Sequence, residues 1–296
     1  MCKISILMST YNEPNVLIEE AVKSILIQSF REFEFIILLD NPQNISIKKL
    51  LLEFAEKDKR IKVIINDSNM GLVGSLNRGL SYCQGEYIVR MDADDISCPN
   101  RIEKQLGFIN QGYDIVGAWY ELFFTDKDQR KIIKFPNTHE ECLQALKNNN
   151  CVPHPLWMVR KSVYNKLGGY RDIYACEDYD FIIRAVKNGF KVGNCPEVLL
   201  HYRFNANSIS RKNAVEQKVI ADFLAYNFRN GRSVELLEYK NYKESKEFND
   251  KYGKLMRINK KILNFKHARS TKEKLVGAIA LVLEPKYIGQ KLKIIK

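Results

Sequence analysis

The sequence predicts an α/β fold in which helices cover both faces of a mostly parallel, Rossmann-like sheet, followed by a helical extension. Short segments rich in Ile, Val and Phe recur every 25–30 residues in the first half of the chain, and segments with helical apolar spacing separate them. This alternation is typical of βαβ units. Beyond residue 212 the pattern is helical, and most of the excess positive charge lies there.

Four segments of the first half are predicted to be buried strands: 4–8, 33–39, 61–65 and 86–91. Helices are predicted between and after these strands, over 15–29, 46–58, 71–83 and 98–111. In the first helix, Val16, Ile18 and Val22 have the spacing of one helical face. Pro99 and a possible N-cap at Ser97 support the start of the last helix.

The pattern changes from about residue 113. We expect one or two strands over 113–124, further strands over 151–161 and 197–204, and helices over 138–148 and from about 178. The remaining segments are predicted to be helices, over 212–229, 233–249, 252–264 and 271–283. We therefore expect one domain over 1–210, with halves that meet near residue 112, and a basic helical extension over 211–296.

The composition indicates a globular protein, with 45% hydrophobic and 28% charged residues in a chain of 296. Seven cysteines are scattered without a C-x-x-C pair, which favours a reducing compartment over a disulfide framework. The first apolar run breaks at Ser9, and no stretch reaches the roughly 18 apolar residues of a membrane-spanning helix. We therefore expect a cytoplasmic protein.

The net charge of +12 is concentrated at the C-terminal end, where residues 251–296 carry 13 Lys and Arg but two acids. Leu255, Ile258, Ile262 and Phe265 recur there at helical spacing, which predicts a basic amphipathic helix. Such a helix predicts a peripheral contact with anionic lipids on the inner face of the plasma membrane. The alternative is a helix packed on the domain with a solvated basic face. Nucleic acid is not expected as a partner, because no aromatic-interleaved single-strand motif accompanies the charge.

Polar residues follow each of the four predicted strands. They are Ser9 to Glu13, Asp40 and Asn41, Asn66 to Asn69, and the acids Asp92, Asp94 and Asp95. In an open α/β sheet, ligands bind beyond the carboxyl ends of the strands. The four polar ends therefore predict one site, although polar loops alone would also explain the third of them.

The three acids favour a metal-dependent nucleotide site over other nucleotide sites. The sequence has neither G-x-G-x-x-G after the first strand nor G-x-x-x-x-G-K-[ST]. A diphosphate then needs another source of positive charge, and a divalent cation held by carboxylates supplies it. Asp92 and Asp94 are two residues apart and could reach one ion. The alternative is a solvated turn in which Asp95 or Ser97 caps the next helix.

Ordered motifs over about residues 3–205 resemble those of the family 2 glycosyltransferases, which are inverting enzymes of the GT-A fold. The motifs are "ISILMSTYNEP", "LLD" at 38–40, "NMGLVGSLNRGL", "YIVRMDADDISCPNRIEKQ", "HPLWMVRKSVYNKLGGY" and "CEDYDFIIR". Within the family, the chain is similar to bacterial enzymes of capsule, exopolysaccharide and O-antigen biosynthesis, of the amylovoran type.

The resemblance implies a donor site in the first half of the domain. Thr10, Tyr11 and Glu13 match the family's first nucleotide-binding segment, and the tyrosine ring would stack on the base. Asp40 would accept a hydrogen bond from the ring N–H of the base, which weakly favours uracil. The family also contacts the nucleotide at the positions of Asn77 and Arg78, although Asn77 could instead be a polar residue on an exposed helix face.

The resemblance also implies a cation and a base. Asp92 would hold the ribose side and approach the metal, and Asp94 would ligate Mn²⁺ or Mg²⁺. Asp95 is a third acid beside them, and His201 lies where some relatives have a further metal ligand. The second half of the domain would bind the acceptor, with His154 and Tyr170 on that side.

The general base of the family is the aspartate of the Glu-Asp pair in "CEDYDF", which is Asp178 here, with Glu177 as its neighbour. An alternative explanation of these acids, together with Asp180, is that they cap a helix N-terminus. The expected reaction is transfer of a sugar from a nucleotide-diphospho-sugar, with UDP favoured, to a hydroxyl of a lipid-linked glycan. A sugar nucleotidyltransferase or a non-catalytic basic membrane or nucleic-acid binder are the alternatives.

Overall fold

The computed structural model describes residues 3–125, 127–205 and 213–267. It confirms the α/β fold with a mostly parallel sheet in the first part and helices in the second. The chain divides into two compact units. The first comprises residues 1–212 and 221–234, and the second comprises 213–220 and 235–296.

The first unit contains one sheet with the strand order β3-β2-β1-β4-β8-β6-β9-β5, and β7 pairs with β6. The pairs β1–β2, β1–β4, β2–β3 and β6–β9 are parallel, and the others are antiparallel. The strands are β1 (Ile4–Thr10), β2 (Phe33–Leu39), β3 (Ile61–Ile65), β4 (Tyr87–Asp92), β5 (Ile96–Ser97), β6 (Ile115–Phe124), β7 (Lys127–Ile133), β8 (Met158–Arg160) and β9 (Val192–Arg203).

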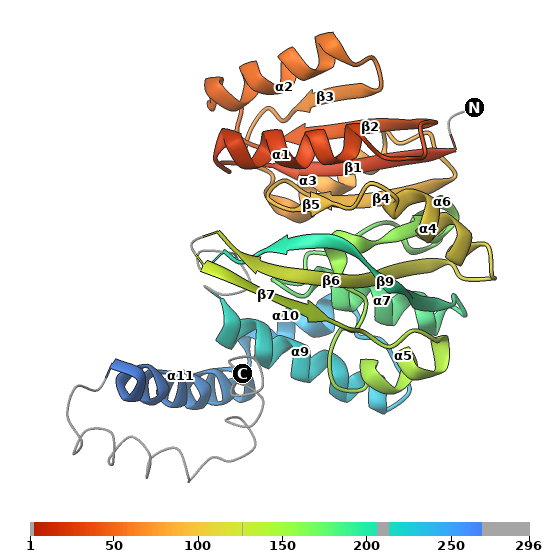
Figure 1. Cartoon of the computed structure of the whole chain (residues 1–296). Coiled ribbons are helices and arrows are strands. Elements are labelled where there is room, and N and C mark those ends of the chain that lie inside the picture. Colours follow the sequence, from red (N-terminus) through yellow and green to blue (C-terminus); the bar gives the residue numbers. More distant parts are fainter. Residues whose placement is uncertain (1–2, 126, 206–212, 268–296) are drawn as a thin grey trace. The chain divides into compact units, whose positions relative to one another are not determined.

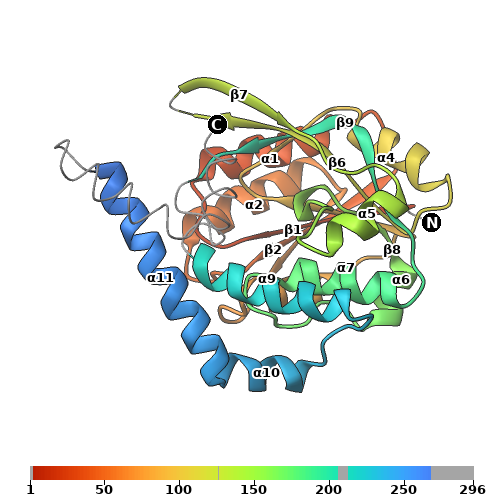
Figure 2. The same cartoon turned by 90° about the horizontal axis from the view of Figure 1, so that it is seen from below.

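The helices of this unit lie on both faces of the sheet, as predicted. Figure 1 shows α1 and α4 in front of the strands, and Figure 2, turned by 90°, shows α6 and α7 on the opposite side. The helices are α1 (Asn15–Leu26), α2 (Ile45–Lys57), α3 (Gly71–Leu80), α4 (Arg101–Ile109), α5 (His139–Leu146), α6 (Lys161–Leu167) and α7 (Glu177–Lys187), with a 3-10 turn, η1, at His154–Leu156.

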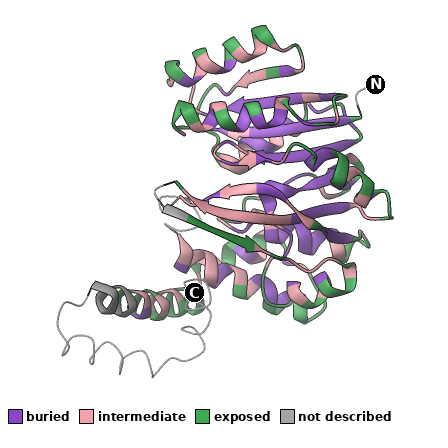
Figure 3. Cartoon of the chain, viewed as in Figure 1, coloured by how far each residue is buried: buried purple, intermediate pink, exposed green. Residues whose placement is uncertain are grey.

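The register of the parallel strands brings three of the polar strand ends to the same edge of the sheet. In the β1–β4 pair, Ser9 lies opposite Asp92, and in the β1–β2 pair, Thr10 lies opposite Leu39, directly before Asp40. The central strands are buried on both faces, which explains their largely apolar sequences, whereas residues 129–132 of the edge strand β7 are exposed (Figure 3). A rigid sheet therefore positions the edge at which the polar residues gather.

Two strand predictions need correction. Residues 151–161 form a 3-10 turn and only three residues of strand, β8, because Pro153 and Pro155 lack the N–H groups that a longer strand would need. β9 begins at Val192, earlier than predicted, and its irregular register opposite β6 between Ala118 and Tyr120 accommodates Pro196. The short strands β5 and β7 were not predicted separately.

Ser97 does not cap α4. The helix begins at Arg101 after Asn100, and no side chain caps it. The Ser97 N–H donates to Ser24 Oγ at 3.0 Å, and its hydroxyl accepts from Gln28 Nε2 at 3.2 Å. Ser97 instead joins β5 to α1 in the buried interior.

The C-terminal helices are α9 (Ala214–Arg229), α10 (Leu236–Glu244) and α11 (Lys246–His267). The break predicted between residues 249 and 252 is wrong. The chain breaks earlier, at the extended residue Ser245, whose hydroxyl accepts from the Phe248 N–H at 3.1 Å and so caps α11. No helix among the described residues is long and apolar enough to cross a membrane. The predicted helix over 271–283 lies outside the described residues, as do the side chains of Ile262 and Phe265.

Candidate active site

The turn after β1 is closed by Glu13. One oxygen of its carboxylate accepts from the Thr10 hydroxyl at 2.6 Å and from the Tyr11 N–H at 2.7 Å. Thr10 is buried beneath the turn, while the Tyr11 side chain remains 43% exposed. Thr10 and Glu13 thus shape the turn, and the Tyr11 ring is left accessible to a planar ligand.

Asp40 is buried in a polar network after β2. Its Oδ1 accepts from Asn66 Nδ2 at 2.6 Å and from the Met70 N–H at 2.8 Å. Asn66 extends the network to α3, because its Oδ1 accepts a hydrogen bond from Arg78 Nη1 at 2.9 Å. Asp40, Asn66 and Arg78 therefore form one hydrogen-bonded group at the ends of β2 and β3, the edge of the sheet where the site is predicted.

Asn77 on α3 hydrogen-bonds with the backbone of Tyr170, and its contact with the nucleotide stays a prediction. Its side-chain amide donates to the Tyr170 carbonyl and accepts from the Tyr170 N–H, both at 2.9 Å. This close contact requires Gly169, where φ is +79° and a Cβ atom would lie 2.5 Å from Asn77 Oδ1. Asn77 thus ties α3 to the loop before α7, which leaves its amide occupied.

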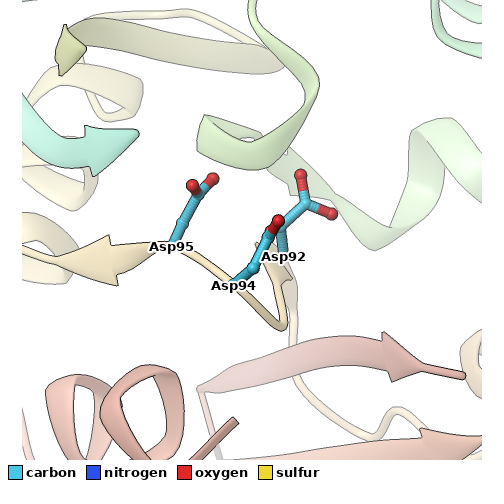
Figure 4. A group of neighbouring side chains, drawn as sticks. All are labelled: Asp92, Asp94 and Asp95. Atoms are coloured by element: carbon cyan, nitrogen blue, oxygen red, sulfur yellow. The ribbon is translucent and has the colours of Figure 1, made fainter. Parts of the chain in front are cut away.

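The loop after β4 gathers three carboxylates. Asp92, Asp94 and Asp95 each offer an oxygen within 4.8 Å of the others. Figure 4 shows the three side chains on the same side of the loop. Asp95 is 1% exposed, and its Oδ1 accepts from the Arg203 N–H at 2.9 Å. The Arg203 guanidinium donates to the Asp94 carbonyl at 2.9 Å, so β9 holds this loop in place.

The carboxylates repel one another. Burial, and then the charges of Asp92 and Glu13, raise the pKa of Asp94 to about 6. Burial, together with Asp92 and Asp94, raises the pKa of Asp95 well above the ordinary aspartate value. Such a cluster is stabilised in its ionised form by a cation.

The donor atoms of this cluster fit a divalent metal ion. Hard cations prefer carboxylate oxygens, and three of them converge here. Asp95 Oδ2 is buried and has no hydrogen-bond partner among the described residues, so a buried acceptor is available in the cluster. Asp92, Asp94 and Asp95 can therefore supply the ligands of Mn²⁺ or Mg²⁺.

The structure does not bring His201 into this carboxylate group. His201 lies on β9, where its Nδ1 is 2.8 Å from Glu121 Oε2 and its Nε2 is 3.8 Å from Cys98 Sγ. The imidazole is thus held by Glu121 on β6, and a role in metal binding stays a prediction.

A second acidic pair begins α7. Glu177 and Asp178 are its first two residues and are both partly buried. Asp178 Oδ1 accepts from the Tyr179 N–H at 2.7 Å, and its Oδ2 accepts from Asn150 Nδ2 at 2.8 Å. Two N–H donors thus hold the Asp178 carboxylate, and both favour its ionised form.

Asp180, the third acid of this turn, is neutralised by two arginines. Its carboxylate accepts from Arg184 Nε at 2.8 Å and from Arg171 Nε at 3.0 Å. Arg184 also donates to the carbonyls of Leu167 and Gly169, both at 3.0 Å. Asp180 therefore anchors the first turn of α7 rather than joining Glu177 and Asp178.

Glu177 and Asp178 differ in their electrostatics. Burial, and then the charge of Asp178, raise the pKa of Glu177 to about 8. Burial also raises the pKa of Asp178, but Asn150, the Tyr179 N–H and Arg90 oppose this rise. The negative charge of Asp178 thus favours the protonated form of Glu177, and the two N–H donors favour the ionised form of Asp178.

Arg90 acts on both acidic groups. It lies on β4, is 4% exposed and forms an ion pair with Asp92. Its charge lowers the pKa values of Asp94 and Asp95 in one group and of Glu177 and Asp178 in the other, in each case against a larger effect of burial. A buried fixed cation thus stands close to both sets of carboxylates.

His154 and Tyr170 lie beside this site but are buried. His154 Nε2 is 2.9 Å from the Tyr170 hydroxyl, which is 3.0 Å from that of Tyr164. Burial, and then the charge of Arg90, lower the pKa of His154 well below its usual value. The two side chains pack with Trp157 and Phe181, and their contact with the acceptor stays a prediction.

Three residues of this site were not predicted from the sequence: Arg90, Asn150 and Arg203. The available signal for Arg90 was a single arginine inside an apolar strand, whereas Arg203 ends a strand of mixed composition and carried no such signal. Asn66 was predicted as part of the polar segment after the third strand, without a role of its own. The triple asparagine at 148–150 carries no signal that separates Asn150 from its neighbours.

Comparison with known proteins identifies relatives of this chain. The sequence matches Glycosyl transferase family 2 over residues 5–168. An uncharacterised glycosyltransferase of Methanocaldococcus jannaschii is 35% identical over 205 residues, which cover 68% of this chain and 70% of that protein. An O-antigen biosynthesis glycosyltransferase of Escherichia coli is 30% identical over 234 residues, with 78% and 91% covered. The Escherichia coli UDP-Gal:alpha-D-GlcNAc-diphosphoundecaprenol beta-1,3-galactosyltransferase is 29% identical over 229 residues, with 76% and 83% covered.

Solved structures share the fold. A mannosyltransferase of Pyrobaculum calidifontis, in complex with GDP-Man and Mn²⁺, has a TM-score of 0.62 at 15% identity, with 97% of this chain and 82% of that chain covered. TarS 1–349 of S. aureus, in complex with UDP-GlcNAc, has a TM-score of 0.61 at 17% identity, with 94% and 79% covered. The family match and these structures confirm the expected family and fold. The chain is a glycosyltransferase that belongs to family 2 and has the GT-A fold.

Proposed function

We propose that this protein is an inverting, metal-dependent glycosyltransferase that transfers a sugar from a nucleotide-diphospho-sugar to a hydroxyl of a lipid-linked glycan. UDP is the favoured nucleotide, and the product is a bacterial surface polysaccharide. The observation that carries the proposal is the pair of acidic groups, one after β4 and one at the start of α7, which share the buried cation Arg90.

The donor occupies the edge at the ends of β1, β2 and β4. The exposed ring of Tyr11 stacks on the base, since every base offers a π-face. The Asp40 carboxylate, oriented by Asn66 and the Met70 N–H, accepts from the ring N–H of the base. The Escherichia coli relative that uses UDP-Gal supports UDP for this chain.

Asp94, with Asp92 and Asp95, holds the divalent cation. When bound, this ion supplies positive charge that stabilises the diphosphate as it leaves. The protein contributes the three carboxylates and the loop that Arg203 and Arg90 hold in place. Arg90 also neutralises part of the acidic charge, so that the site can accept an anionic donor.

Asp178 removes the acceptor proton. As the acceptor oxygen forms its bond to the anomeric carbon, its proton moves to the Asp178 carboxylate, and the bond to the diphosphate oxygen breaks. A single displacement of this kind inverts the configuration at the anomeric carbon. Glu177 keeps its own proton at neutral pH, so no second negative charge lies beside Asp178.

The lipid-linked acceptor rests on two observations. The Escherichia coli relative named above acts on a sugar attached to diphosphoundecaprenol. In addition, the basic segment 251–296 suits a peripheral contact with anionic lipids, although residues 268–296 lie outside the described part of the chain. The alternative for this segment is a helix with a solvated basic face.

The proposed activity is tested by a panel of UDP-, GDP- and dTDP-sugars, with release of the nucleotide as the measurement. We expect Mn²⁺-dependent release of UDP from one UDP-sugar, loss of release in EDTA, and faster release when a GlcNAc-diphospholipid is added as acceptor. Binding of each sugar nucleotide is measured in parallel by calorimetry. If no sugar nucleotide is bound or consumed in the presence of Mn²⁺, the proposal is wrong.

A further inference from the structure

Asn150 lies in the loop between α5 and η1 and makes two hydrogen bonds through its side chain. Its Nδ2 donates to Asp178 Oδ2 at 2.8 Å, and its Oδ1 accepts from the Val152 N–H at 3.1 Å. The first bond spans 28 positions in the sequence, and the second closes a local turn of the kind that asparagine favours. Asn150 thus links a local turn to the acid that begins α7.

The polarity of both partners fixes the orientation of this amide. A backbone N–H only donates, so the Asn150 atom that faces Val152 must be the oxygen. The atom that faces Asp178 is then the NH₂ group, which can only donate. An ionised carboxylate accepts this bond, whereas a proton on Asp178 Oδ2 would remove it. The amide therefore selects the ionised form of Asp178.

The loop that carries Asn150 is held from several sides. Trp157 Nε1 donates to the Val152 carbonyl at 2.9 Å, and Asn194 Nδ2 donates to the Cys151 carbonyl at 3.0 Å. On the other side of the loop, the Tyr179 hydroxyl donates to the Leu146 carbonyl. Because buried side chains fix the backbone around Asn150, its amide is in place before any ligand binds.

Several charged or titratable groups face the start of α7. The charge of Arg90 on β4 lowers the pKa of Asp178, and the charge of Asp178 raises the pKa of Glu177, its neighbour on the same helix. Cys176 precedes the pair as a neutral thiol, because burial and the acids around it raise its pKa. From α9, Asp222 and Arg229 act on Tyr179 with opposite signs. Against burial, the Asn150 hydrogen bond is the largest single influence that keeps Asp178 ionised.

We propose that Asn150 is a positioning residue for the catalytic base, which orients the Asp178 carboxylate toward the acceptor and keeps it ready to accept a proton. This inference rests on the proposed function, in which Asp178 is the base. Asn150 touches Asp178 and not the reacting atoms, so its effect on the rate is exerted through Asp178 alone.

The test compares Asn150→Ala and Asn150→Asp with the control Asn149→Ala, in which an exposed neighbour in the same loop is changed. Asn150→Ala removes the donor without adding charge, whereas Asn150→Asp keeps an acceptor for the Val152 N–H but places a second carboxylate beside Asp178. The pKa of Asp178 is measured by ¹³C NMR titration of labelled aspartate carboxyl groups, with the signal assigned by its loss in Asp178→Asn. We expect both Asn150 variants to raise this pKa by about one unit or more, and the control to leave it unchanged.

The rate of UDP release from the preferred UDP-sugar, measured with Mn²⁺ from pH 5 to pH 9, provides the second readout. In Asn150→Ala we expect the acid limb of the kcat/KM profile to move to higher pH, by as much as the pKa of Asp178 measured by NMR rises. The loss is then about tenfold on that limb and shrinks at higher pH. A merely structural defect would lower kcat/KM by the same factor at every pH.

The outcomes separate this inference from the proposed function. An unchanged Asp178 pKa in both variants overturns the inference, as does a shifted pKa with an unmoved rate profile. If Asp178→Asn keeps the wild-type rate, the base assignment fails, while the NMR titration still reports whether Asn150 controls Asp178. If Asp178→Asn is inactive and the Asn150 variants keep the wild-type profile, only the inference fails.

Discussion

Asp94→Asn lowers kcat/KM for the preferred UDP-sugar by about 10³-fold, which corresponds to roughly 4 kcal/mol of transition-state stabilisation. The substitution keeps the shape of the side chain but removes an anionic ligand from the carboxylate cluster after β4. We expect the Mn²⁺ concentration that gives half-maximal activity to rise as well. The measurement is initial-rate UDP release over a Mn²⁺ titration.

The matched control is Asp250→Asn, which removes an equal charge at an exposed position of α11. Its activity and its Mn²⁺ dependence should equal those of the wild type. Should Asp94→Asn respond to Mn²⁺ as the wild type does, the assignment of this cluster as the cation site would be contradicted. Circular dichroism of both variants establishes that the fold is retained.

Asp178→Asn abolishes most of the transfer, with a fall in kcat of about 10²–10⁴-fold, because the amide cannot accept the acceptor proton. Binding of the UDP-sugar should be unchanged, since the donor lies at the other acidic group. In the wild type, burial raises the pKa of Asp178 above that of an ordinary aspartate. The base works only when ionised, so kcat/KM falls as the pH drops through this raised pKa.

Glu177→Gln is the matched comparison for the base. Glu177, with a pKa of about 8, is already protonated at neutral pH, so glutamine reproduces its charge state. We expect its rate at pH 7 to remain within about tenfold of the wild type, far above that of Asp178→Asn. The reverse order of the two rates would assign the base to Glu177 instead.

The sequence predicted the parts of the fold that depend on local patterns. The segments 33–39 and 61–65 were located to the residue, because each is rich in Ile, Val, Leu or Phe and is bounded by polar or charged residues. The segment 151–161 was misassigned, since its apolar composition suits a strand while Pro153 and Pro155 prevent one. Strand β5, with two residues, is too short to have a period of its own.

The candidate site was predictable where its residues follow strands directly, as Asp40 and Asp92 do. It was not predictable where distant segments meet. Asn150 reaches Asp178 only because the loop after α5 folds against α7, and Asn77 reaches Tyr170 across 93 positions of sequence. Arg90 could be recognised as unusual in its strand. The two acidic groups whose pKa values it lowers become its neighbours only in the folded chain.

The central claim is a single displacement that uses one base, and the configuration of the product tests it most directly. The protein is incubated with Mn²⁺, its preferred α-linked UDP-sugar and a GlcNAc-diphospholipid, and the new glycosidic bond is examined by ¹H NMR. A β-linked product is predicted, because attack from the side opposite the diphosphate inverts the anomeric carbon. An α-linked product would contradict the account, since retention requires a different mechanism from proton removal by Asp178 alone.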